Sequence, residues 1–195
     1  MGYNPEIHHR RSIRLKGYDY SQNGYYFVTI CSEKRQILFE NESVKEMITK
    51  WWHALHEKFP YIRQDEFIVM PNHVHGIIYI VGANQCVRPN MQQQDKNVDP
   101  QGEGRHIGLP LHRIIQWFKT MTTNEYIKCV NENEWKPFHG KFWQRNYYER
   151  IILSDVELYF TREYIKNNPI NWSSDENNPA NFKGNCNTNI SQNIV

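Results

Sequence analysis

Hydrophobic positions along the chain follow the spacing of strands in three places. The segment Tyr25 to Cys31, YYFVTIC, is rich in β-branched and aromatic residues and follows the turn signal Asn23-Gly24, which predicts a strand. The segment Phe67 to Ile80, FIVMPNHVHGIIYI, consists of two apolar runs separated by Pro71-Asn72. This pattern predicts two antiparallel strands joined by a short turn.

Three further segments have the spacing of helices. Apolar residues recur at helical intervals over 44–55, behind a capping-box pattern, SVKE, at 43–46. A second helix is predicted to begin near Pro110. The third opens with another capping-box pattern, SDVE at 154–157, and must end near Pro169 because proline cannot continue a helix.

The length of the chain predicts a single domain, which we place over residues 1–172, with a basic N-terminal arm. Residues 82–108 are polar and rich in Gln, Gly, Pro and Asn, which indicates a loop or insertion within that domain. Residues 173–195 form an Asn-rich tail that we expect to be disordered.

Composition narrows the class of protein. The chain has 195 residues, of which 39% are hydrophobic and 23% charged, as is usual for soluble globular proteins. No apolar run approaches the roughly 20 residues that span a bilayer, and the N-terminus lacks the apolar core of a secretion signal. We therefore expect a cytoplasmic protein. Its four cysteines are far apart and form no CxxC motif, which favours free thiols.

The net charge of +2 does not identify a partner, so the placement of the basic residues matters more. Arg11 and Arg14 lie in the short arm HHRRSIRLKG, and Arg145 ends the segment WKPFHGKFWQR, which interleaves cations with aromatic residues. Cations can hold phosphates while aromatic rings stack on unpaired bases. A solvated arm and a loop whose aromatic residues belong to the core explain these two segments equally well.

Two histidines follow the Pro-Asn break. Residues two apart on a strand project from the same face, so His73 and His75 would point together while Val74 packs behind them. Two imidazoles in this arrangement can bind one metal ion. The spacing alone favours a chance pair at a strand end, because the chain has nine histidines.

Three long blocks change that balance: RRSIRLKGYDYSQNGYYFVTIC, VMPNHVHGIIYI and FWQRNYYERIILSDVELYFTREYIKNNPINW. In sequence and order they resemble the IS200-like single-tyrosine transposases of the HUH type, and within them the REP-associated tyrosine transposases. The resemblance extends from about His8 to Trp172. It implies an α+β fold, in which helices pack on a ferredoxin-like antiparallel sheet with the His-hydrophobic-His motif on a central strand.

The resemblance also implies a function. Enzymes of this family cut and rejoin single-stranded DNA at sites flanked by hairpins, through a 5′-phosphotyrosine intermediate, with a divalent metal and one tyrosine nucleophile. We therefore expect a DNA strand transferase that uses Mg²⁺ or Mn²⁺, because histidine ligands also accommodate Mn²⁺. Its partner would be single-stranded DNA with hairpin or palindromic structure. The chain would act as a monomer or homodimer and would be associated with the nucleoid when bound to DNA.

The family motif assigns the nucleophile to Tyr164, in REYIKNNP, rather than to the adjacent Tyr147 and Tyr148, for which we expect packing or DNA contact. Asn168 lies four residues after Tyr164, hence on the same helix face. By resemblance, Asn168 joins His73 and His75 as the third metal ligand. A tyrosine that simply packs its ring on the sheet is the alternative.

For DNA binding we expect four cations. Arg11 and Arg14 come from the arm, Lys119 lies off the apolar stripe of the helix that begins near Pro110, and Arg145 follows the aromatic segment. Relaxases and replication initiators are disfavoured because they place the tyrosine upstream of the histidines. A histidine-based hydrolase would need a further ligand or acid near HVH. A domesticated protein that binds hairpin or REP-type DNA with weak or no strand transfer stays open as the alternative function.

Overall fold

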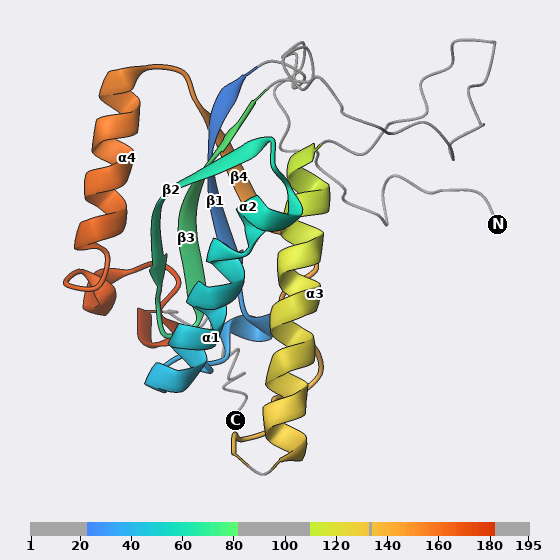
Figure 1. Ribbon diagram of the computed structural model, residues 1–195. Coiled ribbons are helices and arrows are strands. Elements are labelled where there is room, and N and C mark those ends of the chain that lie inside the picture. The colour runs from blue at the N-terminus through green and yellow to red at the C-terminus, as the bar shows by residue number, and fades with distance from the viewer. Residues whose placement is uncertain (1–22, 82–109, 133, 182–195) are drawn as a thin grey trace, which may run out of the picture.

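One antiparallel sheet with strand order β2-β3-β1-β4 organises the structure, a computed structural model that describes residues 23–81, 110–132 and 134–181 (Figure 1). The strands are β1 Gly24–Cys31, β2 Ile62–Val69, β3 His73–Ile80 and β4 Tyr148–Ile152. The helices are α1 Glu42–His53, α2 Leu55–Lys58, α3 Pro110–Asn131 and α4 Asp155–Asn167. Short 3-10 turns cover Glu33–Arg35, Trp172–Ser174 and Pro179–Asn181.

The element order confirms the predicted fold class. Strand β3 lies between β1 and β2 and is antiparallel to both, so β1, α1 and β2 form a split βαβ unit. The fold is therefore α+β with a ferredoxin-like sheet. Both strands predicted from Phe67 to Ile80 are present, and the first begins earlier, at Ile62.

Helices cover both faces of this sheet (Figure 1). On one face, α1 and α3 pack on Val28, Val74 and Ile78 in the main core. On the other face, Leu158 and Ile165 of α4 pack on residues that include Phe27 and Ile77. Because side chains alternate along β3, successive residues contact the α1 and α3 layer on one face and the α4 layer on the other.

Gly76 marks a close approach between β3 and α1. A Cβ at this position would lie 2.5 Å from both Cζ2 and Cη2 of Trp52. Trp52 is fully buried, and its ring stacks on Phe67 with the ring centroids 4.3 Å apart. The glycine of the HVHG sequence therefore makes room for the core on the face opposite the histidines.

Side-chain caps define the starts of α1 and α4. The Oγ of Ser154 accepts a hydrogen bond from the backbone N–H of Glu157 at 3.2 Å, as the capping-box pattern predicts. The box predicted at Ser43 is wrong, because Asn41 caps α1 by accepting from the N–H of Ser43 at 2.9 Å. Asparagine is a strong N-cap, so the helix begins early enough to include Ser43 in its first turn.

Helix α3 begins at Pro110, and α4 ends at Asn167, two residues before Pro169, both as predicted. The basic arm and the polar loop over 82–108 lie outside the described residues. Cys31 and Cys129 are free thiols. Among the residues with described coordinates, no helix is long and apolar enough to cross a membrane.

Candidate metal and tyrosine site

The two histidines of HVH project from the same face of β3, the face covered by α4. Their Nε2 atoms are 3.0 Å apart, and both side chains are almost inaccessible to solvent. Val74 points to the opposite face and belongs to the main core. The structure therefore brings His73 and His75 together as the strand alternation predicts.

The Nδ1 atom of each imidazole ring has a side-chain partner. His73 Nδ1 lies 2.8 Å from Oδ1 of Asn72, whose Nδ2 donates to the carbonyl oxygens of Arg35 at 3.1 Å and Asn177 at 2.8 Å. Because Oδ1 of Asn72 can only accept, His73 must carry its proton on Nδ1, and its Nε2 keeps a free lone pair. His75 Nδ1 is 2.9 Å from Oγ1 of Thr29 on the neighbouring strand.

Burial keeps both rings neutral. It lowers the pKa of His73 to about 3, with a smaller contribution from the charge of Arg35. The pKa of His75 is also lowered to about 3, chiefly by burial and then by His73, against an opposing contribution from Asp175. Neutral imidazoles are the form that binds metal ions.

A third ligand-type residue, Asp175, comes from the chain after α4. Its Oδ2 lies 3.7 Å from Nε2 of His73, while its Oδ1 accepts a hydrogen bond from the N–H of Asn177 at 2.6 Å. One ligand atom each from His73, His75 and Asp175 lie within 4.8 Å of one another. We call these three side chains the histidine site.

The position of Asp175 corrects the expected boundary of the disordered tail for residues 173–181. These residues form two 3-10 turns closed by hydrogen bonds of asparagine side chains, among them Asn178 Nδ2 to the carbonyl of Trp172 at 2.9 Å. Asparagine supports such turns without an apolar core, so its abundance does not distinguish a tail from a folded segment. Residues 182–195 lie outside the described part of the chain.

Tyr164 of α4 faces the histidine site. Its hydroxyl oxygen lies 3.4 Å from Nε2 of His75, and its ring packs edge-on against Phe27, with the ring centroids 6.0 Å apart. The residue is 47% exposed, so part of the side chain faces solvent. The structure thus brings Tyr164 to the two histidines from the opposite end of the chain.

Two ion pairs fasten α4 to the edge strand on either side of Tyr164. Arg162 donates from Nε to Oδ1 of Asp65 at 2.9 Å, and this guanidinium holds the pKa of the Asp65 carboxyl below its usual range. Lys166 Nζ lies 3.2 Å from Oε1 of Glu66. These contacts fix the orientation of the helix and hence of the tyrosine between them.

The surroundings of Tyr164 favour the protonated phenol. Burial raises its pKa, as does the charge of Asp175, whereas a hydrogen bond with the side chain of Asn168 acts in the opposite direction. Asn168 is itself buried, and its Oδ1 has no hydrogen-bond partner. A buried unpaired oxygen is costly and calls for an explanation, which a bound cation would provide.

The geometry fits a divalent ion. Two neighbouring ligands about 2.1 Å from one ion, at a right angle to each other, are about 3.0 Å apart. The Nε2 atoms of His73 and His75 have this separation. Asp175 adds a carboxylate to this cluster, and the side chain of Asn168, which interacts with Tyr164, has an unpaired carbonyl-type oxygen. Mixed imidazole and oxygen ligands suit Mn²⁺ and other divalent ions as well as Mg²⁺.

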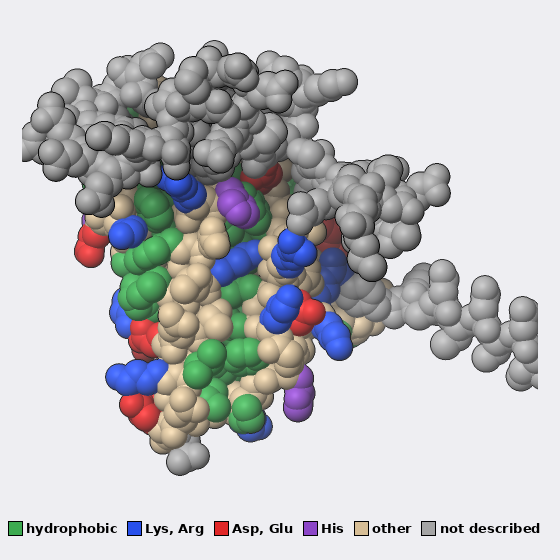
Figure 2. All heavy atoms as spheres, turned by 90° about the vertical axis from the view of Figure 1, so that its right-hand side faces the viewer, with side chains coloured by type: hydrophobic (Ala, Val, Ile, Leu, Met, Phe, Trp, Pro, Cys, Tyr) green, Lys and Arg blue, Asp and Glu red, His purple; other side chains and the backbone are tan. Residues whose placement is uncertain are grey.

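The expected DNA-binding cations have different environments. Lys119 turns inward, and its Nζ donates to the backbone carbonyls of Gln144 at 2.9 Å and Asn146 at 3.2 Å, so it secures the segment before β4. Burial lowers the pKa of Lys119 to about 8. Arg145 is exposed, and Arg11 and Arg14 lie outside the described residues. On the visible part of the face over α3, Lys and Arg side chains are spread among polar and hydrophobic ones (Figure 2).

The aromatic residues around Arg145 belong to the core. Phe142 and Trp143 are buried, and Trp135 and Phe138 pack against them or against Tyr126. The structure therefore favours the core explanation of this segment over base stacking.

Tyr147 and Tyr148, which the family motif does not assign as nucleophile, have different environments. Tyr147 is half-buried, with Nζ of Lys119 5.3 Å from its ring centroid. Tyr148 is 46% exposed and pairs with Thr29, so it lies on the same face of the sheet as the histidine site. Its ring contacts Phe27, at a centroid distance of 6.3 Å.

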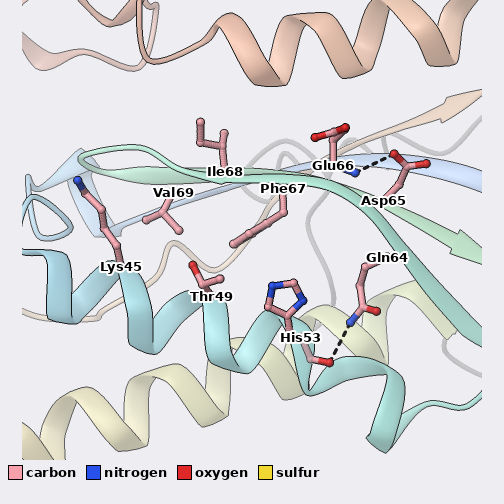
Figure 3. A pocket seen from close by; sticks show the side chains of 9 residues that line it. All are labelled: Lys45, Thr49, His53, Gln64, Asp65, Glu66, Phe67, Ile68 and Val69. Carbon is pink, nitrogen blue, oxygen red and sulfur yellow. Dashed lines mark hydrogen bonds between the residues drawn. The ribbon is translucent and has the colours of Figure 1, made fainter.

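A groove in the described structure lies elsewhere. It has a volume of about 700 Å³ and runs between α1 and the edge strand β2 (Figure 3). Lys45, Thr49 and His53 line one side, and residues 64–69 of β2 line the other. The histidine site, in contrast, lies on the α4 side of the sheet.

Comparison with known proteins gives a close relative. No protein-family model matches the chain. An uncharacterized protein of Haemophilus influenzae is 36% identical over 187 residues, which cover 89% of this chain and 96% of the relative. The chain belongs to the same family as this Haemophilus protein. Family membership at this level holds for nearly the full length of both chains.

Solved structures show what fold this family has. A REP-associated tyrosine transposase bound to a REP hairpin matches with a TM-score of 0.53 and 15% identity, over 83% of this chain and 74% of the transposase. The family therefore shares the fold of that transposase. A transposase structure from Deinococcus radiodurans, described as putative, matches with a TM-score of 0.41 and 12% identity, over 80% and 97% of the two chains, which is too low to support an argument.

Sequence reasoning missed Asp175, Asn72 and Thr29 as members or supports of this site. Asn72 was visible as the turn residue directly before HVH, and an asparagine beside a metal-type histidine is a plausible partner for the ring. Thr29 could only be assigned once the register placed it opposite His75. Nothing in the local sequence around Asp175 connects it to residues a hundred positions earlier.

Proposed function

We propose that this protein is a metal-dependent single-stranded DNA strand transferase, a transposase of the single-tyrosine HUH type. Tyr164 would be the nucleophile, and His73 and His75 would hold a divalent ion together with oxygen atoms of Asp175 and Asn168. The substrate would be single-stranded DNA with hairpin structure. The solved transposase of the same fold is bound to a REP hairpin, which supports this choice of substrate.

One observation carries the proposal. A tyrosine hydroxyl, two neutral imidazole nitrogens and a carboxylate converge at one place, with the hydroxyl 3.4 Å from Nε2 of His75. A tyrosine that only packed on the sheet would have no reason to direct its hydroxyl at a pair of metal-type histidines. Packing of the Tyr164 ring on the sheet would also leave the unpaired oxygen of Asn168 unexplained.

The reaction exchanges one phosphodiester for another. The oxygen of Tyr164 attacks the phosphorus, and the bond from phosphorus to the 3′ oxygen breaks. The phenol loses its proton to water, and the departing 3′ oxygen takes one up. The products are a 5′-phosphotyrosine link and a free 3′-hydroxyl, and a second 3′-hydroxyl can reverse the exchange without ATP.

The raised pKa of Tyr164 means that the phenol needs help to react at neutral pH. A bound divalent ion supplies positive charge beside the phosphate and stabilises the charge that develops in the transition state. His73 and His75 contribute no charge of their own, and Asp175 contributes one negative charge, so the site with a divalent ion stays positive overall. The hydrogen bond from Asn168 favours the phenolate as it forms.

Adduct formation tests the proposal. Labelled single-stranded oligonucleotides from any palindromes that flank the gene are incubated with the protein in Mn²⁺ or Mg²⁺, and a covalent complex is sought on a denaturing gel. We expect the wild-type chain to form this complex, EDTA to prevent it, and Tyr164→Phe to abolish it while DNA binding persists. Tyr148→Phe is the matched control, because Tyr148 is equally exposed on the same face. DNA binding without a covalent complex would favour the alternative, a domesticated hairpin-binding protein.

A further inference from the structure

Arg35 lies at the margin of the histidine site, in the tight turn that follows β1. Lys34 and Arg35 have φ angles of 53° and 55°, in the left-handed region that residues with a Cβ rarely adopt. Two consecutive residues in this conformation store backbone strain, which persists only where the surroundings hold it. Strain of this kind gathers at functional sites.

The backbone of the turn shares its anchor with the histidine site. Asn72 Nδ2 donates to the carbonyl oxygen of Arg35 at 3.1 Å, and Asn72 Oδ1 is the partner of His73 Nδ1. Ser32 Oγ donates to the carbonyl oxygen of Gln36 at 2.7 Å and closes the turn from its other side. Any movement of the turn would therefore also disturb His73.

The guanidinium of Arg35 lies between β1 and the segment that carries Asp175. Its Nη1 donates to the carbonyl oxygen of Glu176 at 3.2 Å. Burial raises the pKa of the Cys31 thiol, and the nearby charge of Arg35 opposes that shift; Cys31 is the direct cross-strand partner of His73.

The described cations around the site, Arg35 among them, have protein partners. Arg162 and Lys166 pair with acidic residues of β2, Arg150 pairs with Glu157, and Lys119 donates to backbone carbonyls. Arg35 differs in its place, because its Nη1 donates to the residue that directly follows Asp175. Asp175 places a negative charge beside His73, which would repel an approaching phosphate. The guanidinium of Arg35, which donates to the residue after Asp175, is planar and permanently charged, so it can offset that repulsion and bind two phosphate oxygens at once.

We propose that Arg35 binds the DNA phosphate that reacts with Tyr164, by donating hydrogen bonds to its non-bridging oxygens. This inference rests on the strand-transfer function proposed above and assigns to it a further substrate-binding residue. The strained turn holds the guanidinium in place before DNA arrives. The interaction strengthens as negative charge builds up on the phosphate in the transition state.

The test compares Arg35→Gly with Lys34→Gly. Glycine relieves the backbone strain at either position, but only the first variant loses the guanidinium. We expect Arg35→Gly to lower the single-turnover rate of adduct formation at saturating DNA by about 100-fold, with a melting temperature equal to or above that of the wild type. Lys34→Gly should keep the wild-type rate. Arg35→Gln provides a second variant that retains side-chain bulk and should be slowed as well.

A substrate with an uncharged group in place of the reacting phosphate shows whether Arg35 contacts that phosphate or only supports the structure of the site. The reacting position is read from the length of the wild-type product, and that phosphate is replaced by a methylphosphonate, which lacks the negative charge. The ratio of wild-type to Arg35→Gly rates should fall toward one on this substrate. If the ratio is the same on both substrates, Arg35 supports the structure of the site without contacting the phosphate, and the inference is overturned. A wild-type rate in Arg35→Gly would also overturn the inference, while leaving the proposed function intact. Absence of any adduct from the wild-type chain would overturn the function itself, and this inference with it.

Discussion

The hydroxyl of Tyr164 lies 3.4 Å from Nε2 of His75, although 89 positions separate the two residues in the chain. The strand alternation of β3 directs the imidazole toward α4, and the ion pairs of Arg162 and Lys166 fix the helix that carries the phenol. This relationship connects the two halves of the proposed site. Its consequences can be measured one residue at a time.

Asp175 should contribute to metal binding. Asp175→Ala removes a carboxylate whose Oδ2 lies 3.7 Å from His73 Nε2, so we expect the affinity for Mn²⁺ to fall by at least about 10-fold. Isothermal titration calorimetry on the DNA-free protein measures this directly. Glu176→Ala is the matched control, because it removes a neighbouring carboxylate that is not in the cluster.

Asn168→Ala tests whether Asn168, the ligand implied by family resemblance, binds the metal in addition to the cluster of His73, His75 and Asp175. If Asn168 is a ligand, its loss should weaken Mn²⁺ binding comparably to the loss of Asp175. Unchanged affinity in Asn168→Ala, together with weakened affinity in Asp175→Ala, would assign the oxygen ligand to Asp175 alone.

Asn72 should support the site without touching the metal. Asn72→Ala leaves Nδ1 of His73 and the carbonyls of Arg35 and Asn177 without their partner, which should lower the free energy of unfolding by about 1–3 kcal/mol. Metal affinity should fall by about 10-fold or more, because the ring loses its fixed orientation. Urea unfolding and metal titration check the two effects. Asn171→Ala, on the exposed surface near the end of α4, should change neither.

The stability of the metal-free protein should depend on pH through the buried histidines. Both rings have a pKa of about 3 in the folded protein, against 6.5 ordinarily. Below pH 6.5 the unfolded chain therefore binds protons that the folded chain does not, and the free energy of unfolding falls as the pH falls toward 3. The loss should be about 2 kcal/mol per ring at pH 5, since one pKa unit is worth about 1.4 kcal/mol.

Urea unfolding in EDTA at several pH values measures that slope. His75→Gln should remove about half of it. A wild-type stability that stays flat between pH 7 and about pH 5 would show that the rings titrate normally in the folded protein.

Gly76→Ala should destabilise the core next to the site. The new Cβ would lie 2.5 Å from two carbons of Trp52, which is fully buried and stacked on Phe67. We expect a loss of about 1–3 kcal/mol, the usual cost of overpacking. Gly140→Ala offers a contrast, because its Cβ would meet nothing within 4 Å and its cost arises from a φ of 77° alone. Equal stability of Gly76→Ala and the wild type would show that Trp52 can move.

The sequence predicted the parts of the site that obey local rules. His73 and His75 share a face because strands alternate, and the helix that carries Tyr164 was bounded by Ser154 and Pro169. The sheet order could be predicted only through family resemblance, because pairing between distant strands leaves little local trace. The one cap that was predicted wrongly, at Ser43, shows how a neighbouring asparagine competes for the same helix start.

The positions of Asp175 and Lys119 could not be predicted from the local sequence. Asp175 lies in an Asn-rich segment without apolar periodicity, and its place beside His73 depends on the chain turning back after α4. Lys119 has the position of a solvent-facing cation on its helix, yet backbone carbonyls from the segment before β4 surround its Nζ. Both outcomes arise from long-range contacts.

Peptide mapping of the covalent complex tests the central claim most directly. Protein and hairpin oligonucleotide are allowed to react in Mn²⁺, the complex is digested with a protease and a nuclease, and the peptide that carries the nucleotide is sequenced by mass spectrometry. The structure predicts a phosphotyrosine link at Tyr164, which is the tyrosine that lies against His75. A link at Tyr147 or Tyr148 instead would contradict the proposed site.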